Sequence, residues 1–129
     1  MNGRYLLDTN IVIGLLENKK SIVEKIEALE EVYIPVTVIG ELYYGAFKSQ
    51  KVEKNLESIS NLLDTANVLD DDAETAKVYG EIKNSLKKRG KPIPENDIWI
   101  AAIAKYNSLT LLTNDEHFKE IPDLAVVEG

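Results

Sequence analysis

Short apolar runs alternate along the chain with longer segments in which apolar residues recur every three or four positions. Runs of the first kind predict strands, and segments of the second kind predict amphipathic helices. The expected strands cover residues 5–7, 32–34, 66–69, 109–112 and 124–127, and the expected helices cover residues 10–17, 21–29, 37–47, 51–63, 72–89 and 97–106. Strands separated by helices favour an α/β fold with a mainly parallel sheet that is covered on both faces.

Two of the expected helices should be buried to different extents. The helix over residues 72–89 has one apolar stripe, made by Ala76, Tyr79, Ile82 and Leu86, and such a stripe faces the core along one side only. The helix over residues 97–106 is apolar nearly all round, so we expect it to have neighbours on most sides. Trp99 belongs to this second helix, and a place in the core is the default expectation for it.

Four acidic residues stand where the fold would bring them together. Asp8 follows the first strand and Asp115 follows a later one, so both are expected at the carboxyl edge of the sheet, where open α/β folds carry their sites. Asp97 opens the apolar helix, and Glu41 lies among apolar neighbours in the helix after the second strand. Each also has an ordinary structural explanation, the aspartates as helix caps and the glutamate as a solvated helix position.

Taken together, the four carboxylates indicate a site for a divalent cation. Neighbouring carboxylates raise each other's pKa unless a cation lies between them, and the hard cations Mg²⁺ and Mn²⁺ choose oxygen ligands. A water held by such a cation can lose its proton near neutral pH and attack a phosphodiester. Asn10, Asn96 and Thr113 are candidates for supporting polar contacts, although Thr113 is equally explained as a β-branched strand residue.

Composition limits the class of protein. The chain has 129 residues, the size of one ordinary domain, and a net charge of −7. This charge counts against a module that binds nucleic acid through phosphates alone, but a nuclease needs an anionic cation site. The chain has no cysteine, and its one histidine, His117, is expected to be an ordinary turn residue. No apolar run approaches the roughly 20 residues of a membrane span, so we expect a soluble, cytoplasmic protein.

Four segments, in order, resemble the successive motifs of PIN-domain proteins. They are residues 6–10, 39–45, 96–102 and 111–118, which read LLDTN, IGELYYG, NDIWIAA and LLTNDEHF. Each motif is weak alone, but four in order at the expected separations are specific. The chain looks most like the VapC-type toxins of bacterial and archaeal toxin–antitoxin pairs, and the resemblance runs from about residue 4 to residue 127.

The resemblance implies a three-layer α/β/α fold with a mainly parallel five-stranded sheet, formed by residues 1–129 as one domain. It implies an Mg²⁺- or Mn²⁺-dependent endoribonuclease that hydrolyses RNA phosphodiester bonds, is often a homodimer and is blocked by a small antitoxin protein. The catalytic and metal-binding carboxylates carry over onto Asp8, Glu41, Asp97 and Asp115. We also expect the antitoxin to bring an arginine into the acidic pocket, because guanidinium fits carboxylates bidentately.

Two other functions stay open on the residues alone. An aspartyl-phosphate phosphotransfer domain also places an aspartate after its first strand. Phosphatases of this kind need a second aspartate at the position that Asn10 occupies here. A receiver domain would use one of the acids at residues 70–72 as its phosphorylated residue. It also needs a lysine after a late strand, and this chain has none there. The other alternative is a non-catalytic binding subunit with the PIN fold.

Overall fold

The computed structural model describes residues 3–129, and the sheet within them has five strands, with every pairing parallel. The strands are β1 (Arg4–Leu7), β2 (Glu31–Pro35), β3 (Val68–Leu69), β4 (Thr110–Thr113) and β5 (Val126–Glu128). Their order across the sheet is β3-β2-β1-β4-β5. The central strand is therefore β1, whose Leu6 pairs with Tyr33 of β2 and with Leu111 of β4.

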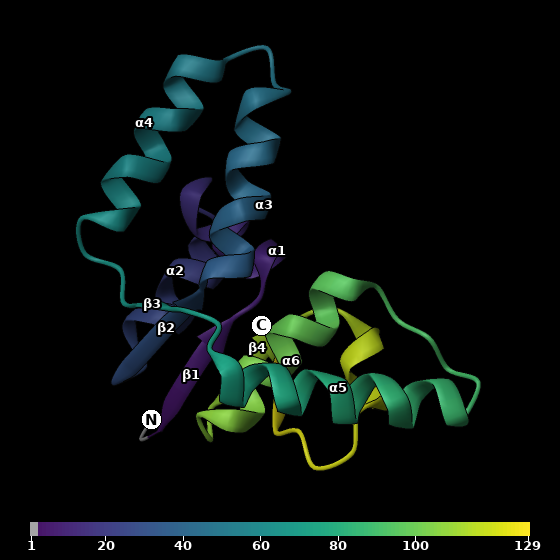
Figure 1. Cartoon of the computed structure of the whole chain (residues 1–129). Coiled ribbons are helices and arrows are strands. Elements are labelled where there is room, and N and C mark those ends of the chain that lie inside the picture. Colours follow the sequence, from purple (N-terminus) through teal and green to yellow (C-terminus); the bar gives the residue numbers. More distant parts are fainter. Residues whose placement is uncertain (1–2) are drawn as a thin grey trace.

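Six α-helices connect these strands within the described part of the chain. They are α1 (Thr9–Leu16) and α2 (Lys20–Glu27) between β1 and β2, α3 (Val36–Phe47) and α4 (Val52–Leu63) between β2 and β3, and α5 (Ala73–Lys88) and α6 (Glu95–Tyr106) between β3 and β4. Because parallel crossovers are right-handed, the first two connections put their helices on one face and the returning third connection puts α5 and α6 on the other. The two groups are separate in Figure 1, where α3 and α4 form a projecting hairpin. The expected three-layer α/β/α fold is confirmed.

The reversal in strand order defines where a site can form. The chain leaves β1 toward β2 on one side, and it later enters β4 on the other side of β1. Connections that diverge in this way leave a crevice at the carboxyl ends of the two strands. Asp8 directly follows β1, and the 3-10 helix η1 (Glu116–Glu120) follows β4, so the acidic motifs meet at this crevice.

The core lies between the central strands and their covering helices. The side chains of Leu6 and Leu111 are fully buried, as expected for strands covered on both faces. In α6, Ile98 and residues 100–104 are buried, which confirms that this helix has neighbours on most sides. Trp99 is only half-buried, so the expectation of a core position was wrong; its ring stacks on Tyr79 of α5 with centroids 4.2 Å apart.

Two helices differ in detail from the expected pattern. In α5 the buried stripe contains Thr75 instead of the exposed Ala76, because positions 75, 79, 82 and 86 keep steps of four, three and four, which follow one helix face more closely. Helix α6 begins at Glu95 and not at Asp97, and the carbonyl of Pro94 accepts the first hydrogen bonds. Proline fits this entry because its fixed φ matches the start of a helix and its missing N–H costs nothing there.

None of the helices in residues 3–129 combines the length and the apolar character needed to cross a bilayer.

Candidate metal centre

Asp8 stands where β1 ends and α1 begins, and it is held there by both elements. Its Oδ1 accepts a hydrogen bond of 2.8 Å from the backbone N–H of Thr9, and its Oδ2 accepts one of 2.6 Å from the hydroxyl of Thr113 at the end of β4. The residue is only 4% exposed. Asp8 therefore does cap α1, as the ordinary explanation held, but it is also fixed against the neighbouring strand.

The position of Asp115 comes from the turn after β4. Its backbone N–H donates to the hydroxyl of Thr113 at 2.9 Å, and its Oδ1 accepts from the backbone N–H of His117 at 2.9 Å. Thr113 thus contacts both acidic residues, and the expectation that Asp8 and Asp115 share one edge of the sheet is confirmed. The turn also makes Asp115 the cap of η1.

Asp97 reaches the same edge from α6, where it is the third residue. The pKa of the Asp97 carboxyl is raised to about 6, first by burial and then by the negative charges of Asp115 and Asp8, against an opposing effect of His117. Burial likewise raises the pKa of Asp8, which the hydrogen bonds from Thr113 and Thr9 oppose. A shift of this direction means that the fold disfavours the charged forms of both carboxyls, chiefly because burial removes them from water.

His117 joins this cluster from its exposed side, contrary to the expectation of an ordinary turn residue. Its Nδ1 is 3.0 Å from Asp115 Oδ1 and 3.3 Å from Asp97 Oδ2. One potential ligand atom from each of these three residues lies within 4.8 Å of the others. In the sequence, the one indication of this contact was that His117 follows Asp115 by two residues in a tight turn. That spacing does not determine where the ring points.

Glu41 is half-buried on α3 and joins the cluster indirectly. Its Oε2 accepts a hydrogen bond of 3.1 Å from the hydroxyl of Thr9, the residue next to Asp8. Asn10 and Asn96 are exposed, and within residues 3–129 no hydrogen bond connects either amide to a carboxylate of the cluster. Of the three candidate supporting residues, Thr113 is the one in direct contact with the acids.

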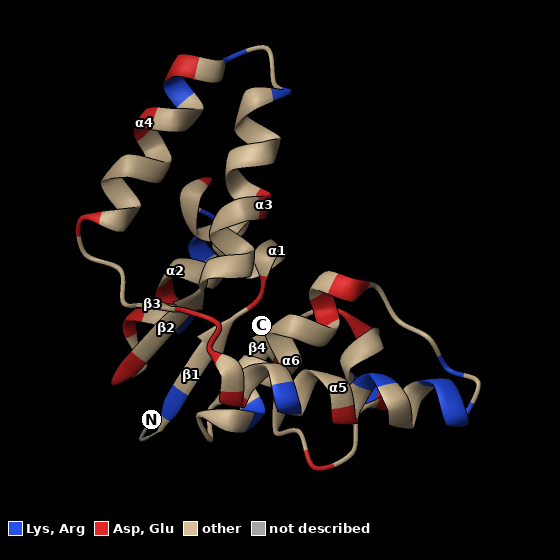
Figure 2. Ribbon diagram, in the orientation of Figure 1, with Lys and Arg blue, Asp and Glu red and all other residues tan. Residues whose placement is uncertain are grey.

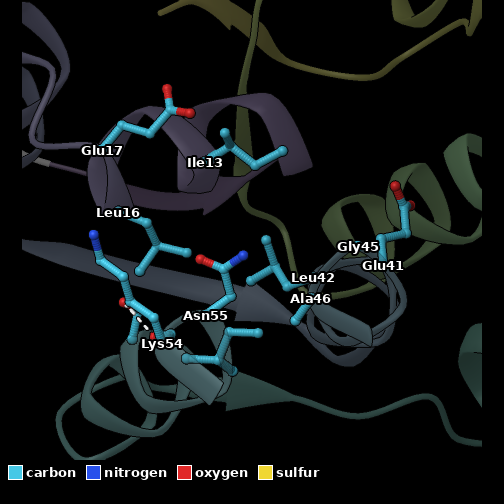
Figure 3. Close-up of a pocket in the computed structure, with 11 residues that line it drawn as sticks. Ile13, Leu16, Glu17, Glu41, Leu42, Gly45, Ala46, Lys54 and Asn55 are labelled. Carbon is cyan, nitrogen blue, oxygen red and sulfur yellow. Dashed lines mark hydrogen bonds between the residues drawn. The ribbon is translucent and has the colours of Figure 1, made fainter. Parts of the chain in front are cut away.

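A groove runs from Glu41 between α1, α3 and α4, with a volume of about 410 Å³. Its apolar floor includes Leu16, Leu42 and Ile59. Figure 3 shows Glu41 at one end and Glu17, the residue after α1, along the rim. Polar side chains, among them Lys54 and Asn55, also line the groove. A groove with an apolar floor and a carboxylate at one end fits a segment that combines apolar side chains with a basic group.

Charge is divided unevenly over the molecule. In Figure 2, basic residues lie at the end of α5 and at the turn between α3 and α4, and acidic residues lie at the start of α6. Lys83 pairs with Glu95 at 2.5 Å and Lys91 pairs with Glu120 at 3.2 Å, so part of the positive charge at α5 is neutralised within the chain.

The donor set fits a divalent cation. Asp8, Asp97 and Asp115 supply carboxylate oxygens, the ligands that Mg²⁺ and Mn²⁺ accept. The pKa values of Asp8 and Asp97 are raised mainly by burial and also by the neighbouring carboxylates, and a cation beside these groups would favour their charged forms. Hydrogen bonds from Thr113 and from the turn after β4 fix the directions of two of these carboxylates, as polar neighbours of metal ligands commonly do.

Comparison with known proteins agrees with this geometry. The family described as "PIN domain" matches residues 5–124. Ribonuclease VapC1 of Haemophilus influenzae (strain R2866) is 38% identical over 125 residues, which cover 93% of this chain and 93% of that protein. The tRNA(fMet)-specific endonuclease VapC of Shigella flexneri is 36% identical over 114 residues, covering 87% of this chain and 86% of that protein.

A solved structure extends the similarity to three dimensions. VapBC2 from Rickettsia felis, bound to a DNA fragment from their promoter, superposes with a TM-score of 0.89 at 32% identity and covers 100% of this chain and 99% of that chain. Asp72, one of the candidate residues of the phosphotransfer alternative, caps α5 by accepting a 2.8 Å hydrogen bond from the backbone N–H of Thr75. The chain belongs to the PIN-domain family, as one of its VapC-type ribonucleases.

Proposed function

We propose that this chain is an endoribonuclease that uses Mg²⁺ or Mn²⁺, with Asp8, Asp97 and Asp115 as the carboxylates that hold the cation and Glu41 beside them. The observation that carries the proposal is the meeting of three carboxylates from three separate segments, with the pKa of Asp97 raised to about 6. A fold keeps such a destabilising cluster where function requires it.

The residues of the site prepare it for phosphodiester hydrolysis. When bound, a divalent cation supplies Lewis-acid chemistry, activating a water molecule and stabilising charge on the phosphoryl group. Thr113 holds Asp8 in one direction through its 2.6 Å hydrogen bond. The hydroxyl of Thr9 holds Glu41 at the entrance of the groove. Because these directions are set before the substrate arrives, little reorganisation is left for the reaction itself.

The names of the relatives support RNA as the substrate class. Transfer RNA is the first kind of RNA to test. The Shigella flexneri relative is named for tRNA(fMet). The basic residues at the end of α5 and at the turn between α3 and α4 lie away from the acidic site in Figure 2, and they are the candidates for contacts with RNA phosphates. The overall charge of −7 then limits unspecific binding to nucleic acid.

We further infer that an antitoxin covers the groove between α1, α3 and α4. The solved Rickettsia felis relative is a VapBC pair, and the groove combines an apolar floor with Glu41 at one end. An arginine at the tip of such a segment would find carboxylates within reach. In a complex with the antitoxin, Gly45→Arg in the groove should weaken binding, whereas Gly80→Arg on α5 should not; a complex with no basic group near Asp8 or Asp97 would contradict the inference.

Homodimeric assembly and residence in the cytoplasm stay predictions. Tyr44 and Phe47 are 67% and 63% exposed on α3, and large aromatic side chains of this kind are enriched in protein interfaces. Sedimentation equilibrium of the wild type and of a Phe47→Ser variant would test whether this surface joins two copies.

The proposed activity is tested by cleavage of a pool of structured and single-stranded RNAs that includes initiator tRNA. The proteins are the wild type, Asp8→Asn, Asp97→Asn and, as a control, Glu57→Gln on the exposed side of α4. We expect cutting with Mg²⁺ or Mn²⁺, none with chelator, none by the two aspartate variants and normal cutting by the control. If a folded Asp97→Asn variant kept full activity, Asp97 would not be part of the catalytic site. If the wild type bound no cation, the result would favour the non-catalytic alternative.

A further inference from the structure

His117 is the one histidine of the chain, and its ring lies over the carboxylates of Asp97 and Asp115. Its side chain is 53% exposed, so the ring is not held there by burial in the core. The backbone N–H of the same residue fixes Asp115 Oδ1 at 2.9 Å. The turn of η1 therefore presents both a backbone donor and an imidazole nitrogen to the same acidic site.

The spacing of these atoms matches neighbouring positions around an octahedral cation. Ligands about 2.1 Å from such an ion and at right angles to each other lie about 3 Å apart. The distances from His117 Nδ1 are 3.0 Å to Asp115 Oδ1 and 3.3 Å to Asp97 Oδ2. If a cation bound both carboxylates, Nδ1 would therefore lie close to a third position of its coordination shell.

We propose that His117 Nδ1 is a direct ligand of the cation, and that this nitrogen makes the site select Mn²⁺ over Mg²⁺. The proposal rests on the proposed function, since it assumes that Asp97 and Asp115 bind a cation. Mg²⁺ is a hard cation that takes oxygen ligands and keeps its waters. Affinity for sites that include a nitrogen ligand rises along the first transition series from Mn²⁺, so an imidazole favours Mn²⁺ over Mg²⁺ and later ions still more. With one of its ligands a nitrogen, the site should bind Mn²⁺ more tightly than oxygen ligands alone would allow.

The competing explanation is that His117 acts only as a hydrogen-bond donor to the two carboxylates. In that case Nδ1 would carry the proton and donate it in hydrogen bonds to the carboxylates, and the ring would not touch the cation. A ligand needs the opposite tautomer, with the proton on Nε2 and the lone pair of Nδ1 directed to the cation. The two explanations differ in whether a bond joins nitrogen to metal, which magnetic resonance detects directly.

The decisive experiment uses tag-free protein labelled with ¹⁵N in histidine and loaded with Mn²⁺. Pulsed electron paramagnetic resonance then measures the hyperfine coupling between the metal electrons and a directly bonded nitrogen. Because His117 is the only histidine, any such imidazole coupling belongs to it. We expect a ¹⁵N coupling of directly bonded size in the wild type and its loss in His117→Leu.

Two substitutions separate ligand chemistry from structure. Both keep the backbone N–H that fixes Asp115. His117→Leu removes the ligand, and we expect the dissociation constant for Mn²⁺ to rise about tenfold or more, the scale of effects seen near metal ligands. His117→Asn places an amide oxygen near the position of Nδ1, so Mg²⁺ binding should be kept while the preference for Mn²⁺ falls. Lys119→Gln, on the same turn and exposed, is the matched control and should change neither constant by more than about twofold, the usual scatter of surface substitutions.

The outcomes distinguish this proposal from the proposed function. If the wild type binds Mn²⁺ without any ¹⁵N coupling, and His117→Leu keeps the same ratio of Mn²⁺ to Mg²⁺ affinity, His117 is not a ligand although the metal site is real. If the wild type binds neither ion, measured by calorimetry, the proposed function fails first. A coupling that disappears in His117→Leu, together with a reduced preference for Mn²⁺ in His117→Asn, supports the proposal.

Discussion

The hydroxyl of Thr113 donates a 2.6 Å hydrogen bond to Asp8 Oδ2, which joins the carboxyl ends of β4 and β1 across 105 residues of sequence. The same hydroxyl accepts the backbone N–H of Asp115 at 2.9 Å. One buried side chain thereby fixes the direction of one carboxylate and the backbone that carries another. It is the contact through which the sheet sets the geometry of the acidic cluster.

Replacing Thr113 by valine should weaken both the fold and the site. Valine keeps the β-branched shape but leaves Asp8 Oδ2 and the N–H of Asp115 without their partner, which costs about 1–3 kcal/mol for a buried group. Cation affinity should fall about 10- to 100-fold, as for other polar neighbours of metal ligands. Urea unfolding in chelator and calorimetry with Mn²⁺ would measure these effects. Thr113→Ser keeps the hydroxyl and serves as control. If Thr113→Val and Thr113→Ser have the same stability and the same Mn²⁺ affinity, the hydroxyl is dispensable.

The raised pKa of Asp97 makes a prediction about stability and pH. Because its pKa is about 6 in the folded protein and near 3.8 in the unfolded chain, the folded state binds the proton more tightly. The stability contributed by this group is complete below pH 3.8 and is lost as pH rises through 6. In chelator, the stability of wild type minus that of Asp97→Asn should therefore decrease between pH 4.5 and 7. A difference that stays constant over this range would show that the carboxyl is not perturbed.

Cation binding should show the corresponding competition with protons. A proton on Asp97 removes a ligand, so affinity for Mg²⁺ or Mn²⁺ should fall as pH drops below about 6, by up to about tenfold for each pH unit. Above that pH, a cation at 100 times its dissociation constant should stabilise the fold by about 2.7 kcal/mol. Calorimetry and thermal unfolding at pH 5 and pH 7.5 would measure both effects. Equal cation affinity at the two pH values would exclude Asp97 as a ligand.

Two helical glycines should respond differently to alanine. A Cβ at Gly45, on the wall of the groove, would meet nothing within 4 Å, while a Cβ at Gly14 in α1 would lie 3.1 Å from Ile22 Cγ1. Gly45→Ala should therefore stabilise the protein by about 0.5–1 kcal/mol through helix propensity. Gly14→Ala should gain less or lose stability, because α2 is packed closely there. Equal gains in urea unfolding would mean that Ile22 can move away at no cost.

The periodicity of the chain was sufficient to predict the class of fold. Strands and helices alternate as expected, and the order of elements allows only a few ways to build a parallel sheet. Their boundaries shifted by one or two residues, and α5 turned out to bury Thr75 in place of Ala76. Small shifts of this kind arise because capping and packing choose among neighbouring helix faces that the pattern alone leaves nearly equivalent.

The sequence also determined which acidic residues are candidates for the site, since Asp8 and Asp115 follow strands and such positions meet at one edge of a parallel sheet. Only the tertiary structure decided how they are arranged. The strand order places β4 beside β1, so that Thr113 reaches Asp8 and α6 brings Asp97 to the same edge. The ring of His117 enters the cluster through the turn of η1. Local patterns specify secondary structure through short-range geometry, but the distance between side chains from separate segments depends on how the elements are packed, and no local pattern carries that information.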